Sequence, residues 1–124
     1  MSQKHRILVV EDEQAERDAL ARVLRMENFA AETASSVESA LPWIDRGMDA
    51  VISDLRLGSG PNGVDLLRAW REQNPTTPFI LLTAHGDVES AVNAIKLGAD
   101  DYLTKPVDPE HLLEDLTDHK RCES

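Results

Sequence analysis

AVISDLRL, residues 50–57, is an apolar run that carries one carboxylate, Asp54, to the end of a predicted strand. A buried strand bounded by glycine-rich sequence is typical of a parallel sheet that is covered on both faces. In such sheets, functional groups gather beyond the carboxyl ends of the strands, where the connecting loops open outward. The run therefore predicts an α/β protein in which Asp54 lies at the rim of the sheet.

Four further short runs accompany this stretch, and an amphipathic helical pattern follows each strand. The other predicted strands are residues 7–10, 30–34, 79–82 and 101–103. The predicted helices are residues 15–24, 37–44, 64–72, 88–95 and 109–116. A strand followed by a helix five times predicts a (βα)5 doubly wound, five-stranded parallel sheet in the flavodoxin-like order 2-1-3-4-5.

Local signals mark where several of these helices begin. Residues 35–36 are serines and candidate N-caps of the second helix, but Pro42 falls inside that helix. A proline inside an α-helix costs ~3 kcal/mol, so this helix is either kinked or begins later than the serines suggest. Asp87 is a candidate N-cap of the fourth helix, and Asp108 followed by Pro109 opens the fifth.

Length and cysteine content limit the class of protein. The 124 residues suffice for one domain, with a folded core of about 5–118 and a polar tail of 119–124. No apolar run approaches the ~20 residues that span a bilayer, and the N-terminus lacks the apolar region of a secretion signal. We therefore expect a cytoplasmic protein without membrane contact. The single Cys122 permits neither an internal disulfide nor a cysteine-based zinc site.

The charge balance bears on the partners of the domain. There are 13 basic and 23 acidic residues, which give a formal net charge of −10. This balance argues against direct nucleic-acid binding, which needs clustered lysines and arginines. The excess acid is either a solvated surface or, in part, a cation site.

Polar residues follow the ends of four predicted strands. Glu11 and Asp12 follow the first, Asp54 ends the third, Thr83 follows the fourth and Lys105 follows the fifth. Because these ends meet at one rim, three carboxylates, a hydroxyl and an amine converge there. Crowded carboxylates repel one another unless a cation compensates, and Mg²⁺ suits a site with few protein oxygens.

This set of residues has the parts that phosphoryl transfer requires. Asp54 is central in the cluster and is the expected nucleophile. Lys105 and Thr83 provide an ammonium and a hydroxyl for the transferred group. A strand-end pair such as Glu11 and Asp12 can also simply cap the first helix and interact favourably with its dipole.

The same residues resemble a known family over nearly the whole chain. Residues 7–13 (ILVVEDE), 52–57 (ISDLRL), 81–84 (LLTA) and 98–106 (GADDYLTKP) are similar to the motifs of response-regulator receiver domains of two-component signalling. The resemblance implies the chemotaxis-regulator-like fold. It also implies that Asp54 accepts a phosphoryl group from a phosphohistidine on a histidine kinase or phosphotransfer protein.

The resemblance further implies a ligand set for Mg²⁺. Asp12 would bind the ion directly, Glu11 would act mainly through water, and Asp54 and the backbone carbonyl of Arg56 would complete the protein ligands. Lys105 would pair with the phosphoryl group.

A switch and an output surface are implied as well. Thr83 and Tyr102 match the switch pair of the family, in which the hydroxyl moves toward the phosphate and the aromatic ring turns inward. The affected surface would be the fourth helix, fifth strand and fifth helix, where a partner, an output domain or a second copy would dock. Arg56 and His85 occupy positions that border the phosphoryl group in relatives. They either tune its hydrolysis or are solvated rim residues.

The match also has departures, and two other functions remain to be compared. Residues 57–62 (LGSGPN) replace the Met-Pro that commonly follows the phosphorylated strand, which leaves the conformation of the 58–63 loop open.

A Mg²⁺-dependent aspartyl-phosphate phosphohydrolase would need a second Asp where Arg56 stands. A flavodoxin-like cofactor binder would need a phosphate loop after the first strand, which is acidic here. The sequence around Asp54 resembles that of receivers in nitrogen-regulation-type transcription activators. The domain is either free-standing or attached to an output domain.

Overall fold

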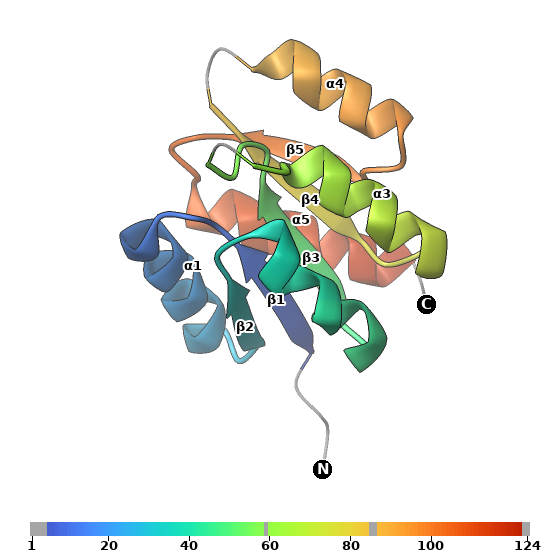
Figure 1. Cartoon of the computed structure of the whole chain (residues 1–124). Helices are drawn as coiled ribbons and strands as arrows, with labels where there is room; N and C mark the ends of the chain where they lie inside the picture. Colours follow the sequence, from blue (N-terminus) through green and yellow to red (C-terminus); the bar gives the residue numbers. More distant parts are fainter. Residues whose placement is uncertain (1–4, 59, 85–86, 123–124) are drawn as a thin grey trace.

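The computed structural model describes residues 5–58, 60–84 and 87–122. Within these residues, parallel strands form one sheet in the order β2-β1-β3-β4-β5 (Figure 1). The strands are β1 (Arg6–Val10), β2 (Ala30–Ala34), β3 (Ala50–Asp54), β4 (Phe79–Thr83) and β5 (Asp101–Thr104). The predicted fold class and strand order are confirmed.

Helices cover both faces of this sheet (Figure 1). They are α1 (Gln14–Met26), α2 (Val37–Ala40), the 3₁₀ helix η1 (Leu41–Arg46), α3 (Gly63–Gln73), α4 (Val88–Lys96) and α5 (Pro109–Cys122). One apolar cluster joins the sheet to α2, η1, α3 and α4, and a second joins it to α1 and α5. The α5 helix runs to Cys122 and so includes part of the segment 119–124 expected to be a polar tail.

The second helix begins where the serines suggest and changes type at the proline. The Ser36 hydroxyl accepts a hydrogen bond from the Ser39 amide, which caps α2. The α-helical bonding ends at Ala40, and Pro42 lies in the first turn of η1. Since proline has no amide hydrogen and clashes with the preceding turn of an α-helix, a tighter 3₁₀ turn takes over. The helix does not begin later, which was the other alternative.

The start of α3 lies against the end of β3. The Asn62 side chain accepts hydrogen bonds from the Val64 and Asp65 amides and caps the helix. A Cβ atom on Gly63 would lie only 2.5 Å from the carbonyl oxygen of Asp54. Glycine therefore allows the backbone of α3 to approach the strand that carries Asp54.

The α4 helix buries small residues and exposes large ones. The sequence pattern predicts an apolar face that includes Ala91, Val92 and Ile95. In the structure Ala91 and Ala94 are buried, whereas Val92 and Ile95 are 42% and 37% exposed. The prediction was wrong for these two residues, because α4 packs on β4 and β5 with Ala91 and Ala94 as its buried residues.

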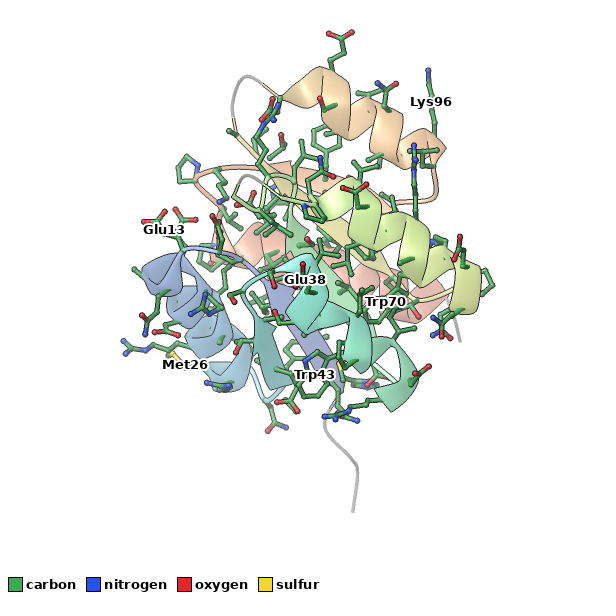
Figure 2. All side chains as sticks on the ribbon, viewed as in Figure 1. Glu13, Met26, Glu38, Trp43, Trp70 and Lys96 are labelled. Carbon is green, nitrogen blue, oxygen red and sulfur yellow. The ribbon has the colours of Figure 1, made fainter. Side chains whose placement is uncertain are left out.

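Both tryptophans pack within the domain (Figure 2). Trp70 of α3 is fully buried and meets Phe79 edge to face, with ring centroids 6.3 Å apart. Trp43 of η1 is half-buried, and the guanidinium of Arg46 stacks 4.9 Å from its ring centroid. No helix within the described part of the chain has the length and apolar character needed to cross a membrane.

Candidate functional site

The register of the strands brings the predicted site residues to one edge of the sheet. Val10 pairs with Ser53 and Asp54 pairs with Leu82, so the ends of β1, β3 and β4 lie side by side. The Lys105 amide donates to the Thr83 carbonyl, which places the residue after β5 beside the end of β4.

Three carboxylates meet at this edge. Oxygens of Glu11, Asp12 and Asp54 all lie within 4.8 Å of one another. Glu11 is 1% and Asp54 8% exposed, whereas Asp12 is exposed. The cluster is thus buried on the side of the sheet and open to solvent at Asp12. Gly58, with a positive φ of 71°, leads the β3–α3 loop past Asp12.

One ammonium group connects this cluster to the end of the chain's fifth strand. Lys105 Nζ donates to Asp54 Oδ2 at 2.8 Å, to Glu11 Oε1 at 2.9 Å and to Glu16 Oε2 at 2.8 Å. Glu16 lies in the first turn of α1 and was not predicted as a site residue. The sequence offers one sign of this role: Glu16 is an acidic residue on the polar side of the first predicted helix, about one turn after Glu11 and Asp12.

Burial and crowding shift the proton affinities of these groups. Burial raises the pKa of Glu11 to about 8, and the neighbouring Glu16 carboxyl adds to the rise. Burial alone would lower the pKa of Lys105, but its hydrogen bonds to Asp54, Glu16 and Glu11 outweigh burial and raise it. The Lys105 hydrogen bond lowers the pKa of Glu16. Lys105 therefore stays charged, and its ammonium contacts three of the carboxyl groups, those of Glu11, Glu16 and Asp54.

The donor set fits a hard divalent cation. All three clustered ligands offer carboxylate oxygens, two of them are buried, and one ammonium does not balance their charge. Oxygen donors of this kind suit Mg²⁺, which keeps several waters and needs few protein ligands. The acidic group is therefore one that Mg²⁺ fits, whereas the predicted contribution of the Arg56 carbonyl remains a prediction.

The two predicted switch residues lie on neighbouring strands, Thr83 at the end of β4 beside Lys105 and Tyr102 on β5 opposite Leu81. Thr83 is fully buried at the end of β4, and its hydroxyl donates to the Ala84 carbonyl at 3.2 Å. Tyr102 of β5 is half-buried and packs against the apolar cluster beneath α3 and α4. Their roles as a switch remain a prediction.

Arg56 pairs with a residue at the start of α4, and its role beside a phosphoryl group remains a prediction. Its guanidinium binds the Asp87 carboxylate with two hydrogen bonds, of 2.7 Å and 2.9 Å. Asp87 stands at the N-cap position of α4, but its side chain makes no capping hydrogen bond. The predicted N-cap position is thus confirmed, but the carboxylate binds Arg56 and not the amides of α4. His85 lies outside the described residues.

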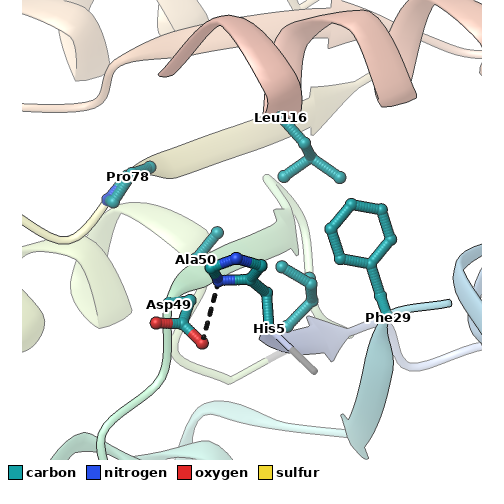
Figure 3. A pocket seen from close by; sticks show the side chains of 7 residues that line it. His5, Phe29, Asp49, Ala50, Pro78 and Leu116 are labelled. Carbon is teal, nitrogen blue, oxygen red and sulfur yellow. Dashed lines mark ion pairs between the residues drawn. The ribbon is translucent and has the colours of Figure 1, made fainter. Parts of the chain in front are cut away.

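A small pocket lies at the opposite edge of the sheet (Figure 3). Its lining includes Ala50 and Pro78 at the amino ends of β3 and β4, and His5 Nδ1 lies 3.7 Å from Asp49 Oδ2. It contains none of the predicted site residues. The chemistry that the sequence predicts is therefore concentrated at the carboxyl edge.

Comparisons with known proteins show the family to which the chain belongs. Residues 7–117 match the family model of the response regulator receiver domain. The chain is 40% identical over 111 residues to the acid tolerance regulatory protein ActR of Sinorhizobium medicae, a match covering 89% of this chain and 57% of ActR. It is 37% identical over 109 residues to an NtrX-like response regulator of Rickettsia bellii, covering 86% of this chain and 23% of that protein.

A solved structure shows the same fold. The response regulator receiver domain protein of Clostridium thermocellum superposes with a TM-score of 0.91 at 30% identity, covering 96% of each chain. The match to the family model begins one residue into β1, covers the other four strands and reaches into α5. The chain belongs to the response regulator receiver domain family.

Proposed function

We propose that this chain is a phosphoacceptor switch of a two-component phosphorelay, in which Asp54 takes a phosphoryl group from a phosphohistidine. The donor would be a histidine kinase or a phosphotransfer protein. The observation that carries this proposal is the contact between Lys105 and Asp54 inside the cluster of carboxylates. In this proposal Asp54 is the nucleophile, Lys105 is the cation for the transferred group, and the clustered carboxylates are the metal ligands.

The chain's own residues have distinct parts in the proposed step. An oxygen of Asp54 attacks the phosphorus, the new O–P bond forms, and the P–N bond of the phosphohistidine breaks. The imidazole nitrogen keeps the electron pair of that bond and is protonated from solvent. Because Lys105 already holds Oδ2 of Asp54, the other carboxylate oxygen is the attacking atom in this proposal. The ammonium then pairs with the transferred group.

Glu11, Asp12 and Asp54 would hold Mg²⁺, with Glu11 acting through water and the Arg56 backbone carbonyl as a further ligand. When bound, Mg²⁺ neutralises the carboxylates and the phosphoryl oxygens, which lets an anionic donor approach an acidic pocket. Burial of Glu11 and Asp54 keeps bulk water from competing with these contacts.

The modification would be relayed from Thr83 and Tyr102 to the surface formed by α4, β5 and α5. Val92 and Ile95 of α4 are exposed large apolar residues on the element that this relay reaches. A partner, an output domain or a second copy of the chain would dock there. Because the chain spans 57% of ActR and 23% of the NtrX-like protein, an attached output domain is part of the proposal. A cytoplasmic location is also part of it.

The test is phosphorylation by acetyl phosphate or a phosphoramidate in the presence of Mg²⁺. We expect one phosphoryl group per chain, stable in acid and labile in base, on Asp54, and none in Asp54→Asn. Removal of Mg²⁺ with a chelator should stop the reaction. Label that persists in Asp54→Asn would refute the assignment. Many turnovers without lasting label would favour the phosphohydrolase instead, although Arg56 stands where that enzyme would need an acid.

A further inference from the structure

An ion pair connects the two loops that border the candidate phosphorylation site. Arg56 lies two residues after Asp54, and Asp87 directly precedes α4. Two guanidinium nitrogens of Arg56 bind the two oxygens of Asp87, at 2.7 Å and 2.9 Å. The side chain of Arg56 is 68% exposed, whereas that of Asp87 is 18% exposed. The pair therefore ties the β3–α3 loop to the start of α4.

Asp87 has a second possible partner that it does not use in this arrangement. Aspartate is among the preferred N-cap residues, because its carboxylate can accept from the amides of the second and third helical residues. In α4 those amides belong to Glu89 and Ser90, and Asp87 makes no capping bond. Its backbone at φ −110° and ψ 20° is also unlike the extended backbone of the Ser36 and Asn62 caps.

We infer that Arg56 and Asp87 form an exchangeable pair: phosphorylation of Asp54 draws Arg56 to the phosphoryl group, and the released Asp87 then caps α4. This inference rests on the proposed function. In the unmodified chain Arg56 keeps the Asp87 carboxylate away from the amides of α4. In the modified chain Arg56 binds the phosphoryl group and Asp87 binds those amides.

The charges favour this exchange in one direction. A phosphoryl group carries more negative charge than a carboxylate and offers three acceptor oxygens, and the planar guanidinium matches either group with two hydrogen bonds. Asp87 would be left exposed after losing Arg56, but the amides of α4 provide a replacement partner. Two arrangements with different partners for the same side chains are what a phosphorylation switch needs.

The consequence reaches the proposed docking surface. α4 carries the exposed Val92 and Ile95, and it meets β5, which contains Tyr102. A capped first turn changes the geometry at which α4 leaves the β4–α4 loop. In the unmodified chain the ion pair would thus favour the arrangement in which α4 is uncapped. This effect is separate from any effect of Arg56 on hydrolysis of the phosphoryl group.

The test is amide hydrogen exchange at Glu89 and Ser90, followed by NMR in the unmodified chain and after phosphorylation. We expect protection of these amides to rise roughly fivefold on phosphorylation, the effect of a capping bond of ordinary strength. Arg56→Gln should raise protection without phosphorylation, because it releases Asp87. Asp87→Ala should abolish the rise in the phosphorylated chain. Arg68→Gln is the matched control, since it removes the same charge from an exposed position on α3.

The outcomes separate this inference from the proposed function. Unchanged protection in Arg56→Gln, or in the phosphorylated wild-type chain, would overturn the exchange while leaving phosphorylation of Asp54 intact. A wild-type chain that takes no phosphoryl group, measured by mass in the same samples, would instead remove the proposed function itself. A rise in Arg68→Gln equal to that in Arg56→Gln would show a general charge effect and would also overturn the exchange.

Discussion

Replacing Gly63 by alanine tests whether the close approach of α3 to β3 holds the site in place. The added Cβ would lie 2.5 Å from the Asp54 carbonyl oxygen and 3.1 Å from the Leu55 Cα, and both are backbone atoms. The start of α3 or the end of β3 must therefore shift by about half an ångström or more. Overpacking of this kind costs about 1–3 kcal/mol. The lower entropy of the unfolded chain returns ~0.4–1 kcal/mol of this.

We therefore expect Gly63→Ala to lower the free energy of unfolding by about 1–2 kcal/mol, or the melting temperature by about 4–8 °C. Urea denaturation measures the first and calorimetry the second. Gly60→Ala is the matched control, because a Cβ there meets nothing within 4 Å. The phosphorylation rate should also fall in Gly63→Ala, since the displaced backbone carries Asp54. If Gly63→Ala were as stable as Gly60→Ala, the contact would not constrain this edge of the sheet.

Three further predictions follow from the site and from the start of α3. Lys105→Gln should slow phosphorylation by roughly 10²–10³-fold and tighten Mg²⁺ binding, because the cation that pairs with phosphate also repels a metal ion; an unchanged rate by mass spectrometry would contradict this. Glu16→Gln should speed phosphorylation by about 2–5-fold, because the negative charge that competes for Lys105 is lost and only a weaker, neutral acceptor remains; the exposed Glu13→Gln should have no such effect, and equal rates in the two variants would refute the reasoning. Asn62→Ala should cost about 1 kcal/mol of stability in urea denaturation, because the cap of α3 is lost; Asn62→Ser should retain most of it, and equal losses would show that the cap does not matter.

Much of the fold could be predicted from short-range patterns. The apolar runs bounded by turn residues gave strands close to those observed, and residues 30–34 match β2 from end to end. The order of the strands followed from general rules on crossovers, and the convergence of Glu11, Asp12, Asp54 and Lys105 followed from that order. These inferences depend on burial, which the apolar runs indicate, and on chain connectivity, which the alternation of strands and helices indicates.

The contacts that sequence reasoning missed all join residues far apart in the chain. Glu16 looks like any polar position on an amphipathic helix, and only the arrival of Lys105, 89 residues later, makes it part of the site. Asp87 carries a true capping signal, but Arg56 competes for it from 31 residues away. In α4 the hydrophobic scale favours Val92 and Ile95 over Ala94, whereas close packing on the strands admits the smaller side chain.

The position of Lys105 also bears on when the proposed activity would appear during folding. Lys105 follows β5, which is the last strand in the chain and lies at an edge of the sheet. It nevertheless binds Glu11 at the end of β1 and Glu16 of α1. Intermediates in which β5 has not yet joined the sheet would retain the acidic residues but lack their ammonium partner. Under the proposed function, full competence to be phosphorylated would then appear when the last strand is in place, and incompletely folded chains would be poor phosphoacceptors.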